Sequence, residues 1–248
     1  MIKIEDVEVM GMRKAIKGMR NAMNSWDKSD SCIDSCIDPI RHCEGCPYEF
    51  VGCNESDYFF IGKADMDLAK HLINAGSSDR KFLRIIHVQA DVTAPLYWWE
   101  ETKAYKINTI PNSCFPMDTI LEREFTLDDF SHEHLIECYE PGENYYFQDY
   151  SNASPLWLLK ATRDLLNHCH ELYLKTNDKK WWWQMIQLLP SSFNQMRTID
   201  LDYETLFSIY CERKNHELDE WVEFCKWIET LPYMKEFLES DEQSETKE

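Results

Sequence analysis

Cysteine is the residue type whose spacing in this sequence most directly suggests chemistry. Half of the ten cysteines lie within residues 32–53, in the order C-x3-C-x6-C-x2-C-x6-C. Cys43 and Cys46 are separated by two residues, and this spacing lets both thiolates reach one tetrahedral ion. The zinc ligands that we predict are Cys36, Cys43, Cys46 and Cys53, with Cys32 or His42 as substitutes.

A zinc site with four protein ligands has no open coordination position. Its role would therefore be to stabilise the fold rather than to catalyse a reaction. A loop of free thiols, or one with an adventitious disulfide, is the alternative explanation, and an iron–sulfur cluster is a third. Because residues 32–53 contain little core-forming sequence of their own, we interpret them as a Cys-rich insertion in a larger domain.

A second candidate site lies within residues 79–117, where a predicted helix ends in a polar loop. Mostly apolar residues recur at every second position over residues 82–90, which predicts a strand with one face on the core. Thr93 is a suitable helix N-cap and Pro95 suits the first turn, so we predict a helix over residues 96–106. The small polar side chains that follow could hold a ligand, and they are Asn108, Thr109, Asn112, Ser113 and Cys114.

This stretch resembles the core of the flavin-dependent thymidylate synthases, in which an Ala-Pro-led helix ends in Arg-His-Arg and a serine follows in the next loop. The helix start, Ala94-Pro95-Leu96-Tyr97, matches that pattern. At the positions of the Arg-His-Arg signature this sequence has Ala104, Tyr105 and Lys106. Ser113 follows one residue earlier than the serine of the family pattern. Asp79 stands where the family often has a histidine that contacts the flavin.

A second resemblance to the same family covers the run from Leu189 to Trp221. The family has a Leu-Pro turn, a Thr, an Asn-x-Arg pair near the start of a long helix, a nucleotide-binding Arg further along, and then a His/Gln/Trp/Glu cluster. The matching residues are Leu189, Pro190, Thr198, Arg213, His216, Glu220 and Trp221. Asp202 replaces the Asn and Glu204 replaces the Arg of the pair.

The resemblance implies a thymidylate synthase-like enzyme that methylates dUMP to dTMP with methylene-tetrahydrofolate and FAD. Flavin and folate carry the chemistry in that family, so protein side chains orient the substrates and offset phosphate charge. The partners implied are a pyrimidine nucleotide, a folate and further copies of the chain in a homotetramer, because the family builds its site between subunits. The alternative function is that of a divergent, non-catalytic member that kept a nucleotide pocket and acts in binding or assembly.

The family pattern assigns nucleotide binding to Lys106, Ser113 and Arg213, since a dianionic phosphate needs convergent cations and hydroxyls. Lys103 and Arg197 are helpers. The cofactor-binding residues that the pattern implies are Lys103, Tyr105, Asp202 and His216. The substrate-binding residues also have ordinary explanations: Arg213 could form surface ion pairs, Lys106 could neutralise a helix C-terminus and Ser113 could cap a turn. No side chain is predicted to be catalytic.

The remaining pattern predicts an α/β protein with a central sheet and long helices. Alternation over residues 1–10 predicts a strand, and helical spacing of apolar residues follows it over residues 12–23. Further helices are predicted over residues 65–75, 154–173, 181–189 and 203–228, with Gly76, Ser154 and Asp202 as cap residues. The run Trp181-Trp182-Trp183 covers too much of a helix circumference for one buried stripe. At least one indole should therefore face a partner subunit or a ligand, although any single one of them could be packed in the core.

The predicted domain organisation is one folded domain, residues 1–239, with the Cys-rich insertion at residues 32–53. Residues 240–248 read as a disordered acidic tail. His87 lies on the predicted strand, where we expect it to be packed rather than catalytic.

Composition limits the partners and the compartment. The net charge of −19 opposes binding to nucleic acid or to an anionic membrane. No apolar run reaches the roughly 18 residues needed to cross a bilayer, and the N-terminus lacks the apolar stretch of a signal peptide. We therefore expect a cytoplasmic protein whose cysteines are thiols or metal ligands.

Overall fold

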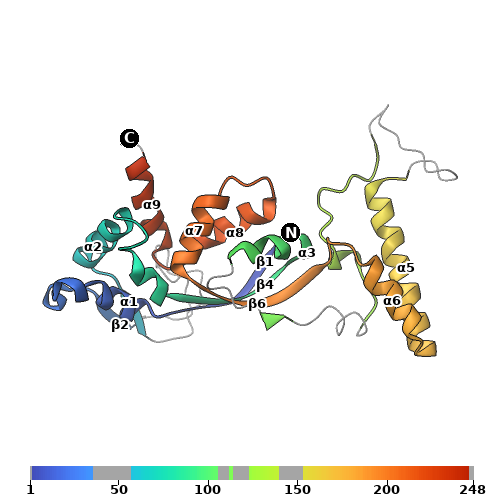
Figure 1. Ribbon diagram of the computed structural model, residues 1–248, viewed down its shortest axis with the longest axis horizontal. Coiled ribbons are helices and arrows are strands. Elements are labelled where there is room, and N and C mark those ends of the chain that lie inside the picture. The colour runs from blue at the N-terminus through green and yellow to red at the C-terminus, as the bar shows by residue number, and fades with distance from the viewer. Residues whose placement is uncertain (1, 36–56, 106–111, 114–122, 140–152, 246–248) are drawn as a thin grey trace. The chain divides into compact units, whose positions relative to one another are not determined.

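The computed structural model describes residues 2–35, 57–105, 112–113, 123–139 and 153–245 (Figure 1). The chain forms two compact units. Unit 1 is made of Met1–Lys3, Val92–Ala104 and Asn112–Arg197, and unit 2 of Ile4–Asp91, Tyr105–Pro111 and Thr198–Glu248. Each unit therefore combines segments that are far apart in the sequence.

The larger of the two sheets in the described ranges has the strand order β1-β4-β6-β5. Its strands are β1 (Lys3–Met10), β4 (His87–Pro95), β6 (Asn194–Asp202) and β5 (Asn112–Ser113). The Tyr203 N–H donates to the Ile86 carbonyl at 2.9 Å, and the Leu96 N–H donates to the Phe193 carbonyl at 3.0 Å. Residue numbers rise along β4 while they fall along β6, so this central pair is antiparallel. The smaller sheet pairs β2 (Cys32–Ser35) with β3 (Asp57–Phe60), with Cys32 opposite Phe60.

Strand β4 differs in its bounds from the predicted strand. Its buried side chains alternate from Val88 to Ala94, whereas residues 81–85 form a 3₁₀ helix. Phe82 and Leu83 are both buried, and two successive buried side chains fit a helical turn better than a strand. The strand also continues through Thr93, so the prediction that Thr93 caps the next helix was wrong. Pro95 occupies the N-cap position of α3 (Leu96–Thr102), and a 3₁₀ turn, Lys103–Tyr105, follows.

Strand β6 has no counterpart among the predicted elements. Gln195, Ile199 and Leu201 are buried at alternating positions, and half-buried Arg197 lies between them. Only two of these four side chains are apolar, so the hydrophobic alternation that marks a strand is too short to recognise. The strand ends at Asp202, and helix α7 begins at Tyr203.

The helices of unit 2 are α1 (Met12–Met19), α2 (Lys63–Asn74), α7 (Tyr203–Arg213), α8 (Asp219–Glu229) and α9 (Met234–Glu245). Helices α7 and α8 lie side by side (Figure 1). The sequence predicts one continuous helix over residues 203–228. In such a helix the buried Ile209 and Trp221 would point about 120° apart, and the break lets both face the core. Helix α9 extends past residue 239, where the sequence predicts the folded domain to end.

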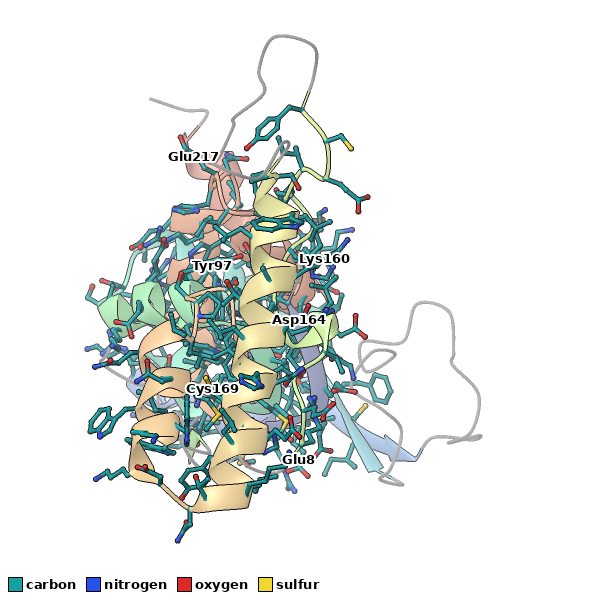
Figure 2. All side chains as sticks on the ribbon, turned by 90° about the vertical axis from the view of Figure 1, so that its right-hand side faces the viewer. Glu8, Tyr97, Lys160, Asp164, Cys169 and Glu217 are labelled. Carbon is teal, nitrogen blue, oxygen red and sulfur yellow. The ribbon has the colours of Figure 1, made fainter. Side chains whose placement is uncertain are left out.

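Unit 1 is built on a helical hairpin of α5 (Pro155–Thr176) and α6 (Lys179–Leu188), which lie side by side in both views (Figures 1 and 2). Ser154 caps α5 as predicted, since its side chain accepts a hydrogen bond from the Trp157 N–H. Cys169 lies between the two helices in Figure 2 and belongs to a core with Met185 and Phe193. Of the three consecutive tryptophans, Trp183 is 44% exposed, so at least one indole lies outside the core.

No helix in the described ranges is both long enough and apolar enough to cross a bilayer.

Gly11 is a position where we expect a large effect of a small substitution. Its φ of +91° is a left-handed conformation, and an added Cβ would lie 2.1 Å from the Ile85 carbonyl oxygen. Gly76 also has a positive φ, +103°, but an added Cβ there meets nothing within 4 Å. Gly76→Ala should therefore cost about 1–2 kcal/mol from backbone strain alone. Gly11→Ala should cost about 1–3 kcal/mol more, because the Ile85 backbone must shift. Urea denaturation of both variants measures the difference, and equal costs would contradict the predicted clash.

Candidate functional site

A half-buried guanidinium lies between two aromatic rings in unit 2. The guanidinium carbon of Arg213 is 5.0 Å from the ring centroid of Trp221 and 5.7 Å from that of Tyr105. The two rings meet edge to face, with centroids 5.8 Å apart. Such contacts hold the plane of a guanidinium, and a fixed, planar cation suits the binding of phosphate or carboxylate.

The hydroxyl of Tyr105 connects this cation to a carboxylate. The Arg213 Nε–H donates to the Tyr105 hydroxyl at 2.8 Å, and the hydroxyl donates to Glu212 Oε2 at 2.8 Å. Burial raises the pKa of Tyr105, and the bond to Glu212 raises it further, whereas Arg213 lowers it. The net shift is upward, so the hydroxyl keeps its proton at neutral pH and can donate.

His216 borders the same cluster. Its ring lies edge to face with Trp221, with centroids 6.4 Å apart. Nδ1 of His216 accepts the Leu218 N–H at 3.1 Å, which fixes the ring in the turn between α7 and α8. Trp221 is fully buried beneath these groups. We name Tyr105, Glu212, Arg213, His216 and Trp221 the Arg213 cluster.

Helix α7 positions Arg213 within the cluster. The Asp202 carboxylate caps this helix by accepting the Thr205 N–H at 2.7 Å, as predicted from the sequence. Arg213 is the last residue of α7, where a cation interacts favourably with the helix dipole. The Asp202 cap therefore stabilises the N-terminus of α7, and the Arg213 cation stabilises its C-terminus.

Two predicted residues of unit 1 have other neighbours. Lys103 forms an exposed ion pair with Glu100 at 2.5 Å. The Arg197 guanidinium carbon lies 4.5 Å from the ring centroid of Trp99, and its Nε and one terminal nitrogen donate to the Gln195 side chain. Burial lowers the pKa of Arg197, with Glu100 acting in the opposite direction.

Several predicted site residues lie outside the part of the chain that the structure describes. These are Lys106 and the four predicted zinc ligands, Cys36, Cys43, Cys46 and Cys53. Ser113 is described only as a backbone position in β5. Among the described residues, no group of three or more His, Cys, Asp or Glu side chains could hold a metal ion. The zinc site therefore stays a prediction.

The main sheet carries a row of polar side chains that was not predicted from the sequence. His87 is not packed as expected: its side chain is 42% exposed, and Nδ1 lies 2.9 Å from Asp200 Oδ1. Further along the same two strands, the Thr198 hydroxyl donates to Asp91 Oδ1 at 2.6 Å. The sequence pattern that indicates this row is the alternation of His87, Gln89 and Asp91 in β4. Alternate residues of a strand point to the same face, so these three lie on the face opposite the buried one.

Comparison with known proteins finds no match to the sequence among family models or curated proteins. The fold, in contrast, matches solved structures. Two are of flavin-dependent thymidylate synthase ThyX from Helicobacter pylori with FAD and dUMP. One has a TM-score of 0.56 and 14% identity, covering 94% of this chain and 97% of that chain. The other has a TM-score of 0.58 and 13% identity, covering 97% of this chain and 99% of that chain.

A third structure is of the UMP/dUMP methylase PolB from Streptomyces cacaoi bound with 5-Br dUMP. It has a TM-score of 0.52 and 13% identity, covering 99% of this chain and 95% of that chain. The chain therefore has a mixed α/β fold, and it shares this fold with proteins named as a thymidylate synthase and a UMP/dUMP methylase. More narrowly, it has the fold of the flavin-dependent thymidylate synthases, and the predicted fold class is confirmed. The Cys-rich insertion lies largely outside the described residues.

Proposed function

We propose that this protein binds a pyrimidine nucleotide, dUMP, and methylates it to dTMP with methylene-tetrahydrofolate and FAD. The observation that carries the proposal is the Arg213 cluster. Tyr105 and Arg213 are 108 positions apart in the sequence and are hydrogen-bonded to each other. The family pattern alone assigns both residues to the site. Tyr105 comes from the first stretch that resembles the family, and Arg213 comes from the second.

In the proposed site Arg213 binds the nucleotide phosphate, and the family pattern assigns Lys106 and Ser113 to the same nucleotide. A dianionic phosphate gains charge-assisted hydrogen bonds from a guanidinium, and the flat fork of arginine can bind two of its oxygens at once. Because the whole chain carries a net charge of −19, a nucleotide needs such a local cation to overcome the long-range repulsion. No acid or base is assigned to the protein.

FAD, when bound, would supply the hydride for the reaction. Of the residues assigned to it, Lys103 and His216 fit this role, because the first is an exposed cation and the second a half-buried aromatic ring beside Trp221. Asp202 fits it poorly, since its side chain is 2% exposed and its carboxylate caps α7. The hydroxyl of Tyr105 is held by Arg213 and Glu212. The folate and a homo-oligomer are parts of the proposal that rest on the resemblance.

Two measurements on the purified protein test the activity. We expect protein incubated with FAD to show the flavin absorption after gel filtration. We also expect it to release tritium from dUMP labelled at C5 when methylene-tetrahydrofolate and a reductant are present, because methylation replaces that hydrogen. Protein that takes up no FAD and releases no tritium would exclude the enzymatic function.

A non-catalytic nucleotide-binding or assembly protein is the second candidate function. The observation that favours it is the composition of the signature positions, where Ala104 and Tyr105 replace an arginine and a histidine and Lys106 replaces a second arginine. A lysine cannot form the two parallel hydrogen bonds of a guanidinium. Binding of dUMP without tritium release would support this second function over the first.

A further inference from the structure

We propose that Tyr105 is a positioning residue that orients the Arg213 guanidinium for the nucleotide phosphate, with Glu212 as its anchor. The inference rests on the proposed nucleotide site at Arg213. It assigns Tyr105 a role other than the contact with FAD that the family pattern implies. The three side chains form a relay in the order Glu212, Tyr105, Arg213.

Donor and acceptor chemistry fixes the direction of the relay. A guanidinium only donates and an ionised carboxylate only accepts, whereas a phenol can do both at once. The Tyr105 hydroxyl accepts from Arg213 Nε at 2.8 Å and gives its one proton to Glu212 Oε2 at 2.8 Å. Replacing Tyr105 by phenylalanine therefore removes two hydrogen bonds while it keeps the ring that packs against Trp221.

The relay also controls the angle at which the cation faces a ligand. The Nε–H is the donor nearest the aliphatic stem, so a bond at this atom fixes the rotation of the guanidinium about its last carbon–nitrogen bonds. The rings of Tyr105 and Trp221 limit the same rotation. An arginine that is already oriented loses less conformational entropy when the phosphate binds.

Glu212 gives the relay an electrostatic role. This exposed carboxylate is adjacent in sequence to Arg213, and its charge repels an incoming dianion. The same carboxylate accepts the proton of the Tyr105 hydroxyl, and this bond fixes the hydroxyl oxygen to which Arg213 donates. Replacing the carboxylate by an amide keeps an oxygen that can accept from Tyr105 and removes the repulsion.

The experiment compares dUMP affinities by isothermal titration of the full chain. Tyr105→Phe is expected to weaken dUMP binding about tenfold, because one charge-assisted hydrogen bond that orients the cation is lost. Tyr210→Phe is the matched control, since the Tyr210 hydroxyl on the same helix α7 donates to the exposed Glu229 at 2.6 Å. We expect the control to bind dUMP as the wild type does. Glu212→Gln is expected to bind it as tightly as the wild type or more tightly.

A double-mutant cycle separates positioning from a general structural role. Lysine has no Nε–H that the Tyr105 hydroxyl could hold in the arginine geometry, so Tyr105→Phe should have no further effect on affinity in an Arg213→Lys background. A purely structural role of Tyr105 would instead weaken binding by the same factor in both backgrounds. That additive outcome would overturn the proposal.

The two levels of the proposal fail in different ways. Absence of dUMP binding by the wild type would overturn the proposed function, and this inference with it. Tight binding by the wild type, weak binding by Arg213→Ala and unchanged binding by Tyr105→Phe would overturn the relay alone.

Discussion

Replacing Asp65 by alanine is expected to lower the free energy of unfolding by about 3–5 kcal/mol, because it leaves a buried arginine without its counter-charge. Asp65 lies in the first turn of α2 and is fully buried. Its Oδ1 accepts from Arg20 Nε at 2.5 Å, and Arg20 itself is buried. Its other oxygen accepts from the Ser29 hydroxyl at 2.6 Å and from the Ser31 backbone N–H at 3.2 Å. The side chain therefore connects α1, α2 and the segment before β2.

Urea denaturation followed by circular dichroism measures this loss. Asp67→Ala is the matched control, because Asp67 lies on the same helix and is exposed. Surface substitutions of this kind usually change stability by less than about 0.5 kcal/mol. An Asp65→Ala variant with the urea midpoint of the control would show that the Arg20 pair contributes nothing to the fold.

The same group makes stability depend on pH. Burial alone would raise the pKa of Asp65, but hydrogen bonds from Ser29, Ser31 and Arg20 outweigh it, and the pKa lies below the ordinary value of 3.8. A carboxyl whose pKa is lower in the folded state stabilises the protein above its unfolded pKa, and this stability is lost as the pH falls through the folded pKa. We expect the difference in stability between the wild type and Asp65→Ala to be constant near neutral pH and to shrink below about pH 4. A difference that persists undiminished at pH 2 would contradict this.

Replacing Arg213 by alanine is expected to weaken dUMP binding by about one to two orders of magnitude, the range for loss of charge-assisted hydrogen bonds to a phosphate. Arg213→Lys should retain part of the affinity, since it keeps the charge and loses the planar fork. The binding that remains in Arg213→Ala should also depend less on salt concentration, because one cation no longer contributes.

Isothermal titration at two salt concentrations checks both expectations. Lys214→Ala is the control, because Lys214 is the next cation along the chain and its ammonium lies 5.5 Å from the Tyr210 ring, outside the Arg213 cluster. Thermal melting should accompany the titration, since Arg213 also packs on the fully buried Trp221. Equal affinity in the wild type and Arg213→Ala would place the nucleotide pocket elsewhere.

Local chemistry made some elements predictable from the sequence. Ser154 and Asp202 were identified as caps because their side chains satisfy backbone N–H groups only a few residues away, and both do so in the structure. Gly76 adopts the left-handed conformation expected of a residue that ends a helix. Features that depend on distant partners were not predictable in this way. The inward positions of β6 include Gln195 and Arg197, and the Arg197 guanidinium lies over the ring of Trp99, which is distant in the sequence.

The candidate site also contains residues that could be predicted from the sequence and a residue that could not. Arg213, His216 and Tyr105 could be assigned only from the order of residues in the family pattern, and the structure places them in one cluster. Glu212 is not among the residues that the sequence predicts for the site. Its bond to a hydroxyl 107 positions away could not be read from periodicity or from caps, because both report on contacts within a few residues.

The direct passage from β6 into α7 has a further consequence for the guanidinium. Asp202 is both the last residue of the strand and the cap of the helix, so no intervening loop can absorb a change in strand pairing. A shift of β6 against β4 by one residue would move the start of α7 by about 3.3 Å along the strand and would turn the β6 side chains to the other face of the sheet. The pairing of two strands in the sheet therefore sets the position of Arg213, the cation at the other end of that helix.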